Sequence, residues 1–284
     1  MFKKVLVALD FSGPAMELFN SLEDLRRLGL QELLLVHAIR SEIGLQSDIH
    51  PLQKKFLDKV ILKKGELEQE GLIVNVEVPV GAPAEEIRRL ALEKKMDLIL
   101  IGSVGESSTV RELLLGSTVV DVVRIAPVPV LVEKYLSVGK TARRMPIFKE
   151  KLASVILPTD FSTNAEFVYK KMLEISDTLQ SVILLYVVDK GETVEGVKNT
   201  EKEATEQLKQ WEERFRENGV NSRSMVLHGT PSLEILAKAE QERITLIALS
   251  RRGKGKMANL FIGSVADQIV RSSRCPVLLY GKSE

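Results

Sequence analysis

Two aspartates each end a short apolar run and stand directly before Phe-Ser. Asp10 closes VLVALD near the start of the chain, and Asp160 closes VILPTD past its middle. A carboxylate at the end of a buried parallel strand can accept hydrogen bonds from a ribose or a base, or can help to hold a metal ion. The alternative is that each aspartate only caps the following helix, a task that Ser12 and Ser162 are equally able to perform.

Glycine-bearing loops follow another apolar run in each half. The first, LILIGSVGESSTVRELLLGST, contains Gly102, Gly105 and Gly116, and the second, LIALSRRGKGKMANLFIGSV, contains Gly253 and Gly263. Glycine lets backbone N–H groups approach an anion closely, and a helix N-terminus adds a partial positive charge. These loops are therefore candidate phosphate sites; the alternative is that they are ordinary turns.

A helix is expected to begin at the end of each loop. Ser264 and Asp267 have the spacing of a capping box, in which a serine or threonine at the helix start is paired with an acidic residue three positions later. In the first half Thr118 and Asp121 have this spacing, one residue later. Both helices would direct their N-terminal N–H groups toward the strand edge that carries the aspartates.

The residues that position these groups occur twice along the chain, in the same order. Four motifs repeat at nearly constant spacing: Asp10-Phe11-Ser12 with Asp160-Phe161-Ser162, Gly81-Ala82-Pro83 with Gly229-Thr230-Pro231, Gly116-Ser117 with Gly263-Ser264, and Pro129-Val130-Leu131 with Pro276-Val277-Leu278. Such a repeat indicates two copies of one unit. A chain of 284 residues is long enough for two domains of ordinary size.

Apolar runs alternate with helical periodicity inside each half. The first half has five runs that predict strands, at 5–9, 32–39, 73–80, 98–102 and 128–132. Helical spacing of apolar residues lies between them, for example at Phe56, Val60 and Leu67 in the first half, and at Ala204, Leu208 and Phe215 in the second. Near-continuous apolar strands indicate a parallel sheet that is covered on both faces.

This pattern predicts an α/β fold of two tandem doubly wound domains, each with a five-stranded parallel sheet flanked by helices. We place the domains at residues 1–137 and 152–284. Residues 138–151 mix glycine, proline and basic side chains without a sustained period, which is typical of a linker.

Composition excludes several function classes. Lys and Arg number 40 against 39 Asp and Glu, so neither nucleic acid nor a membrane surface is an expected partner. The three histidines are far apart in sequence, which argues against a metal site, and a single cysteine cannot form an internal disulfide. The start MFKKVLVALD lacks the features of a signal peptide, so we expect a soluble cytoplasmic protein.

Taken together, these motifs resemble those of the universal stress protein family. The resemblance rests on a strand that ends in Asp-Phe-Ser, a Gly-x-Pro turn, the pattern G-x2-G-x9-G-[S/T] before a helix, and a final PVLV strand. It covers both halves of the chain. It implies sheets with strand order 3-2-1-4-5, and pairing of domains through their last strands, which are apolar here and would be costly as exposed edges.

The resemblance also implies an adenine-nucleotide site in each half, where the first aspartate and a residue after the second strand contact adenosine and the glycine loop holds the phosphates. Carried over position by position, it designates Asp10, Ala38, Gly102, Gly105, Gly116, Ser117 and Thr118 in the first half, and Asp160, Val187, Gly253, Gly263, Ser264 and Val265 in the second. Two departures stand out. Ten residues instead of nine separate Gly105 from Gly116, and Ser250 replaces the first glycine of the second loop.

The second loop is strongly basic, because it contains Arg251, Arg252, Lys254 and Lys256. A basic loop attracts phosphate, so the second half is expected to favour the more highly charged nucleotide. The alternative is a solvated surface run with no role in binding.

The resemblance leaves three functions open. The leading one is a regulatory stress protein that binds ATP or AMP, with or without Mg²⁺, in one or both domains, and that associates as a homodimer or larger homo-oligomer. The second is an interaction scaffold with vestigial sites. The third is a slow ATPase, although the chain has no Walker motif, kinase-like set or Ser/His/Asp signature, and no catalytic residue is assigned.

Overall fold

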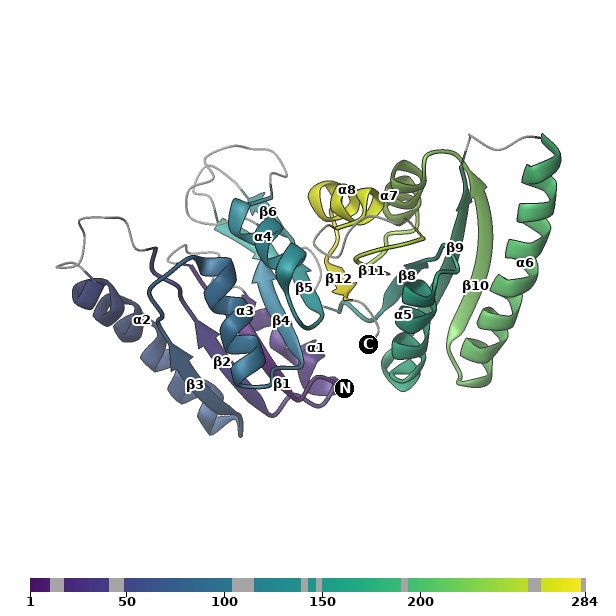
Figure 1. Cartoon of the computed structure of the whole chain (residues 1–284). Coiled ribbons are helices and arrows are strands. Elements are labelled where there is room, and N and C mark those ends of the chain that lie inside the picture. The colour runs from purple at the N-terminus through teal and green to yellow at the C-terminus, as the bar shows by residue number, and fades with distance from the viewer. Residues whose placement is uncertain are drawn as a thin grey trace. The chain divides into compact units, whose positions relative to one another are not determined.

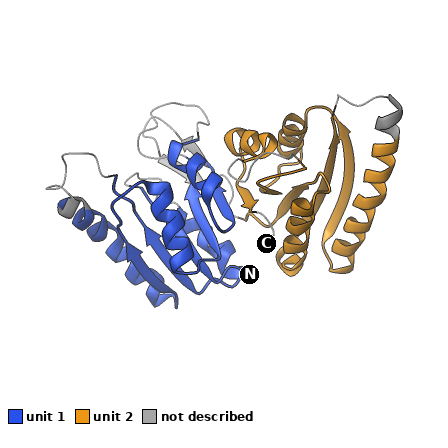
Figure 2. Cartoon of the chain, in the orientation of Figure 1, with its two compact units in different colours: residues 1–146 blue, residues 147–284 orange. Residues whose placement is uncertain are grey.

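The computed structural model describes residues 1–10, 18–40, 49–103, 115–138, 143–146, 150–189, 194–254 and 262–281. The chain divides into two compact units, Met1–Pro146 (unit 1) and Ile147–Glu284 (unit 2), which Figure 2 shows in blue and orange. Each unit contains its own five-stranded parallel sheet with helices around it (Figure 1). The predicted α/β class and tandem arrangement are confirmed.

The sheet of unit 1 has the strand order β3-β2-β1-β4-β5, and all its neighbouring strands are parallel. Its strands are β1 (Lys4–Ala8), β2 (Glu32–Val36), β3 (Ile73–Glu77), β4 (Leu98–Gly102) and β5 (Val130–Glu133). Its helices are α1 (Leu22–Arg27), α2 (Ile49–Gln69), α3 (Pro83–Glu93) and α4 (Ser117–Ile125). This is the predicted order 3-2-1-4-5.

Unit 2 repeats that order as β10-β9-β8-β11-β12. Its strands are β8 (Ser154–Pro158), β9 (Ser181–Val188), β10 (Asn221–His228), β11 (Leu246–Ser250) and β12 (Val277–Tyr280). Its helices are α5 (Thr163–Leu173), α6 (Val194–Glu217), α7 (Pro231–Gln241) and α8 (Ser264–Ser272), with a short 3-10 turn, η3, at Ser176–Thr178. Helix α7 packs beside α8, and α5 packs beside α6.

The cores form where the sequence places continuous apolar strands. The central residues of β1 and β4 are buried on both faces of the sheet, as are those of β8 and β11 in unit 2. The helices contribute the predicted apolar stripes, because Phe56, Val60 and Leu67 are buried on α2, as are Leu208 and Phe215 on α6. Burial of this kind stabilises a domain by about 25 cal/mol for each Å² of apolar surface removed from water.

Two further strands lie near the boundary between the units. Strands β6 (Tyr135–Val138) and β7 (Arg143–Pro146) pair in antiparallel fashion as a separate two-stranded sheet. They fall partly within residues 138–151, which we expected to be a linker without regular structure. The lack of sustained periodicity in the sequence gave no sign of this pair, because four residues are too few to show alternation.

The two Gly-x-Pro turns start equivalent helices. Pro83 and Pro231 are the first residues of α3 and α7, where a missing N–H costs nothing. In each case a glutamate of the first helical turn folds back over the glycine: a Cβ built at residue 81 would lie 3.0 Å from Glu86 Oε1, and one at residue 229 would lie 2.8 Å from Glu234 Cδ. Gly229 also has a φ of +153°, where an L side chain is strained.

We predict that Gly229→Ala lowers the free energy of unfolding by about 1–2 kcal/mol, because it forces an L residue into an unfavourable backbone region against Glu234. The matched control is Gly65→Ala in the interior of α2, where nothing lies within 4 Å of an added Cβ. That variant should gain roughly 0.5–1 kcal/mol through helix propensity. Urea unfolding followed by circular dichroism measures both; a stability of Gly229→Ala equal to wild type would contradict the first expectation.

Candidate functional site

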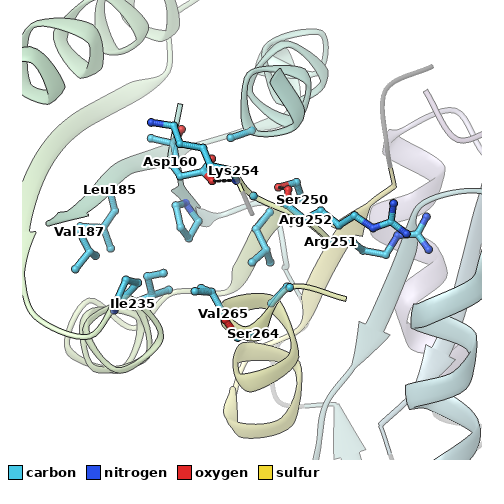
Figure 3. Close-up of a pocket in the computed structure, with 18 of the residues that line it drawn as sticks. Asp160, Leu185, Val187, Ile235, Ser250, Arg251, Arg252, Lys254, Ser264 and Val265 are labelled. Carbon is cyan, nitrogen blue, oxygen red and sulfur yellow. Dashed lines mark hydrogen bonds between the residues drawn. The ribbon is translucent and has the colours of Figure 1, made fainter. Parts of the chain in front are cut away.

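A cavity of about 440 Å³ opens at the carboxyl ends of the strands of unit 2. Its walls come from the ends of β8, β9 and β11, from the loop after β11, and from the first turns of α5, α7 and α8 (Figure 3). This is the edge at which open parallel sheets bind their ligands, since strand ends and helix N-termini converge there. We call this space the unit 2 cavity.

All six residues predicted for the second half line the unit 2 cavity. These are Asp160, Val187, Gly253, Gly263, Ser264 and Val265. They come from four segments that are far apart in sequence, and the fold brings them together.

The candidate residues of unit 1 lie at the corresponding edge of its own sheet. Asp10 and Ala38 follow β1 and β2, Gly102 ends β4, and Gly116 precedes Ser117 and Thr118 at the start of α4, whereas Gly105 lies outside the described residues. The end of β2 reaches α4 through Arg40, whose guanidinium donates to Thr118 Oγ1 at 3.4 Å. The ends of β1 and β2 are joined by His37 Nδ1, which lies 3.0 Å from the carbonyl oxygen of Leu9.

Asp160 accepts a backbone N–H with each carboxylate oxygen. Oδ1 accepts from Ser162 N at 3.0 Å, and Oδ2 accepts from Lys254 N at 2.8 Å. The second of these bonds is the dashed line in Figure 3. The cap of α5 is supplied by Ser162, whose Oγ accepts from Ala165 N at 3.2 Å. Of the two alternatives for the second half, capping therefore falls to the serine, and the aspartate faces the cavity.

Gly253 is needed because of the close approach of Asp160, and not because of its backbone angles. Its φ is not positive, but a Cβ at this position would overlap Asp160 Oδ2 and would lie 3.3 Å from Cγ. Gly263 has more space for a side chain, since an added Cβ would come no closer than 3.4 Å to any atom outside its chain neighbours. The two glycines of the second loop therefore serve different purposes.

The predicted capping boxes are wrong. Helix α8 begins at Ser264 with Gly263 as its N-cap, and Asp267 accepts a hydrogen bond from Arg271 Nε at 2.8 Å instead of capping. In unit 1, α4 begins at Ser117 with Gly116 as its N-cap, and Asp121 accepts from Arg124 at 3.2 Å. Glycine takes the extended N-cap conformation in both, and the acidic residues sit within reach of arginines three or four positions later.

The absence of a side-chain cap leaves the first turn of α8 open toward the cavity. Ser264, Val265 and Ala266 all line the cavity, and their N–H groups make no hydrogen bond to another residue of the described segments. N–H groups without a partner in the described segments, at the positive end of a helix, are an arrangement that can accept an anion.

Ser250 fits its position without backbone strain. Among the described residues, positive φ at a non-glycine position occurs only at Lys95, Phe161 and Arg243. The Ser250 hydroxyl donates to the carbonyl oxygen of Arg252 at 2.7 Å, which holds the start of the loop. The departure from glycine at this point thus adds a hydrogen bond.

The basic residues of the second loop are not all directed at the cavity. In Figure 3 the side chains of Arg251 and Arg252 extend away from Asp160, although both residues contribute to the lining. Burial, and to a lesser degree the charge of Arg252, lowers the pKa of Arg251 to about 10, so its guanidinium stays protonated at neutral pH. Lys254 also lines the cavity, and Lys256 lies outside the described residues.

The wall of the cavity that comes from the end of β9 and from α7 is apolar. Leu185, Val187 and Ile235 face the cavity in Figure 3, and Tyr186, Pro231 and Leu249 also line it. Sequence reasoning found only Val187 among these. Ile235 comes one turn after the start of α7, and Tyr186 directly precedes Val187; their apolar character is equally expected of core residues, so the sequence carried no signal that they line a site.

An aromatic stack backs this wall. Tyr186 stacks on Phe161 with ring centroids 5.3 Å apart, and Phe161 meets Trp211 edge-on at 5.5 Å. Phe161 has a φ of +54°, held by Thr159 Oγ1, which accepts its N–H at 2.9 Å. The single tryptophan of the chain is therefore connected to the cavity through two rings.

The arrangement suits a ligand with three different parts. The apolar wall can accept a flat hydrophobic group, Asp160 can accept hydrogen bonds from hydroxyl or amino groups, and the first turn of α8 can accept an anion.

Within the described residues, no three His, Cys, Asp or Glu side chains are grouped closely enough to hold a metal ion. Among the helices of the described ranges, none has the length and hydropathy needed to cross a bilayer.

Comparison with known proteins agrees with the repeat. The model of the universal stress protein family matches residues 1–134 and again 152–281. The universal stress protein MJ0577 of Methanocaldococcus jannaschii is 30% identical over 156 residues, which cover 47% of this chain and 96% of that protein. MJ0531 of the same organism is 30% identical over 138 residues, covering 45% of this chain and 81% of that protein.

Solved structures show the same fold over the full length. A universal stress protein from Archaeoglobus fulgidus superposes with a TM-score of 0.77 and 22% identity, covering 100% of both chains. A protein of unknown function from Pseudomonas aeruginosa, PA1789, superposes with a TM-score of 0.69 and 13% identity over 99% of this chain and 92% of that one. With two family matches that together span nearly all of its length, the chain belongs to the universal stress protein family and carries two tandem copies of the domain.

Proposed function

We propose that this universal stress protein binds an adenine nucleotide, ATP or AMP, in the unit 2 cavity and acts as a nucleotide-responsive regulator. The observation that supports this most directly is that one cavity of about 440 Å³ joins an apolar wall, a carboxylate and three orphan N–H groups. These are the three chemical surfaces that a base, a ribose and a phosphate need. The motifs that repeat in the same order in both halves point to the same ligand class through the family resemblance.

The parts of the ligand are assigned by chemistry. The base would lie against Leu185, Val187 and Ile235, and the ribose hydroxyls would donate to Asp160. The phosphates would accept hydrogen bonds from the N–H groups of Ser264, Val265 and Ala266. With ATP, Mg²⁺ would be held largely by the phosphates and water, as this ion keeps much of its hydration shell.

Unit 1 is proposed as a second site of the same kind. Its candidates Asp10, Ala38, Gly102, Gly116, Ser117 and Thr118 occupy corresponding places at the carboxyl edge of its sheet. The hydrogen bonds that shape this edge are repeated: Gly116 N donates to Ser103 O at 2.9 Å, as Gly263 N donates to Arg251 O at 2.8 Å. Gly105, also a candidate, lies outside the described residues.

Binding, and not turnover, is the activity that the cavity supports best. Among the described residues that line the cavity, Asp160 is the only carboxylate, and its remaining acceptor positions are assigned above to the ribose hydroxyls. Hydrolysis needs a group free to orient water and strong stabilisation of the leaving phosphate. Regulation would follow if nucleotide binding shifts a conformational or association equilibrium. Self-association of the chain stays a prediction that light scattering of the purified protein tests.

Asp160→Ala should weaken nucleotide binding by roughly 10-fold to 100-fold, the loss expected when hydrogen bonds to a charged acceptor are removed. The control is Asp177→Ala, since Asp177 is an exposed residue of η3 away from the cavity lining. Isothermal titration with ATP and with AMP measures the affinities. Release of nucleotide from freshly purified protein, identified by mass spectrometry, checks the ligand class independently. Equal affinities for both variants would contradict the proposed role of Asp160.

Ser264→Pro should weaken binding of ATP and AMP but leave binding of adenosine unchanged. Proline is tolerated at the first position of a helix and removes one of the three N–H groups, and Gly263 already has the extended ψ of 148° that a residue before proline adopts. The control, Ser264→Ala, keeps the N–H and removes only the hydroxyl. An equal loss in Ser264→Ala, or an equal loss for adenosine, would show that the backbone N–H does not carry the anion. Fluorescence of Trp211 offers a second readout of the titration.

A further inference from the structure

We infer that Asp160 has a second role, as a positioning residue that fixes the loop after β11 and so links the nucleoside end of the unit 2 cavity to its anion end. Its Oδ2 accepts the N–H of Lys254 at 2.8 Å, across 94 residues of sequence. We call this contact the Asp160–loop link. The inference deepens the proposed function and rests on it for the identity of the ligand, but not for the contact itself.

The carboxylate can hold the loop and a ligand at the same time. Each ionised carboxylate offers about four lone-pair positions. Two are used by the N–H groups of Ser162 and Lys254, on different oxygens. The other two remain for hydroxyl or amino donors of a ligand, so a bound nucleoside need not displace the N–H groups that hold the loop.

Gly253 makes this contact possible. Any side chain at residue 253 would overlap Asp160 Oδ2, so the carboxylate and the loop backbone could not both keep their places. Since the φ of Gly253 is not positive, the close approach is the physical reason for glycine here. The glycine of the loop therefore serves the Asp160–loop link directly, in addition to any exposure of N–H groups to phosphate.

A short path of hydrogen bonds runs from the loop to the start of α8. The carbonyl oxygen of Arg251 accepts the N–H of Gly263 at 2.8 Å, and Gly263 is the N-cap of α8. Arg251 N in turn donates to Tyr280 O at the end of β12, at 2.8 Å. Residues 251–254 are thus fastened to Asp160 at one end and to the anion-binding turn at the other. Loss of the hydrogen bond between Asp160 and Lys254 should therefore disturb the start of α8, although Asp160 lies outside that turn.

The first experiment needs no ligand. Hydrogen exchange of the Lys254 amide is measured in wild type, Asp160→Ala and Gly253→Ala. Alanine at residue 160 has no acceptor, so the N–H of Lys254 loses its partner. Both variants should exchange at Lys254 about tenfold faster or more, as expected when a protecting hydrogen bond is lost. Lys254→Ala keeps the N–H and should stay as protected as wild type after correction for the intrinsic rate.

An unchanged Lys254 exchange rate in both variants would overturn the Asp160–loop link. Circular dichroism and urea unfolding confirm that each variant is folded. The double variant Asp160→Ala with Gly253→Ala should exchange no faster than the faster single variant, because both changes break the same contact. Additive effects would show that the two residues act independently and would also overturn the inference.

The second experiment tests the coupling between the two ends of the cavity. Gly253→Ala keeps the carboxylate that would bind the ribose. If Asp160 only contacts the nucleoside, the affinities of this variant for adenosine and for ATP should change equally relative to wild type. The Asp160–loop link predicts that ATP affinity falls at least about fivefold more than adenosine affinity, within the range of ordinary site–site coupling. Equal losses would overturn the coupling. Failure of wild type to bind either ATP or AMP would refute the proposed function, while the exchange experiment would still decide the link.

Discussion

The carboxylate of Asp160, shared between two backbone N–H groups, is the contact on which the site of unit 2 depends. It ties the end of β8 to the start of α5 through Ser162 and to the loop after β11 through Lys254. Hydrogen bonds to a charged acceptor stabilise by about 1.5–3 kcal/mol each, more than neutral ones. The neighbouring residues make this possible: Ser162 takes over the cap of α5, and Gly253 leaves space for the oxygen. One side chain thus joins the turn between β8 and α5 to a loop that lies 94 residues away in sequence.

The two units reproduce the same edge with different side chains. Ser103 in unit 1 and Arg251 in unit 2 both donate their N–H to the last residue of the neighbouring strand, Glu133 and Tyr280, each at 2.8 Å. Both then accept the N–H of the glycine that begins the next helix. Because these bonds join backbone atoms, the arrangement survives the replacement of serine by arginine and of glutamate by tyrosine. At these positions the repeat is therefore more exact in the backbone than in the side chains.

Much of this could be predicted from the sequence, and the errors have identifiable causes. Continuous apolar strands such as those around Leu6 and Leu100 predicted buried parallel sheets, and the family resemblance supplied the strand order. The sequence left open whether Asp160 or Ser162 caps α5, because both lie within reach of the first turn; only three-dimensional geometry distinguishes them. The capping boxes failed because a glycine N-cap competes with serine and because Arg271 offers Asp267 a partner one turn away. Ile235 and Tyr186 escaped notice, since an apolar residue gives the same signal in a core and in a cavity wall.

The open first turn of α8 has a consequence for how such a protein diverges. The groups that we propose to bind an anion there belong to the main chain, so the side chains at these positions are not themselves the ligands. Unit 1 has Ser117-Thr118 at the start of its helix where unit 2 has Ser264-Val265. Substitutions can therefore accumulate in this turn after a duplication while the N–H groups of the main chain stay in place, provided that no substitution changes the direction of the helix.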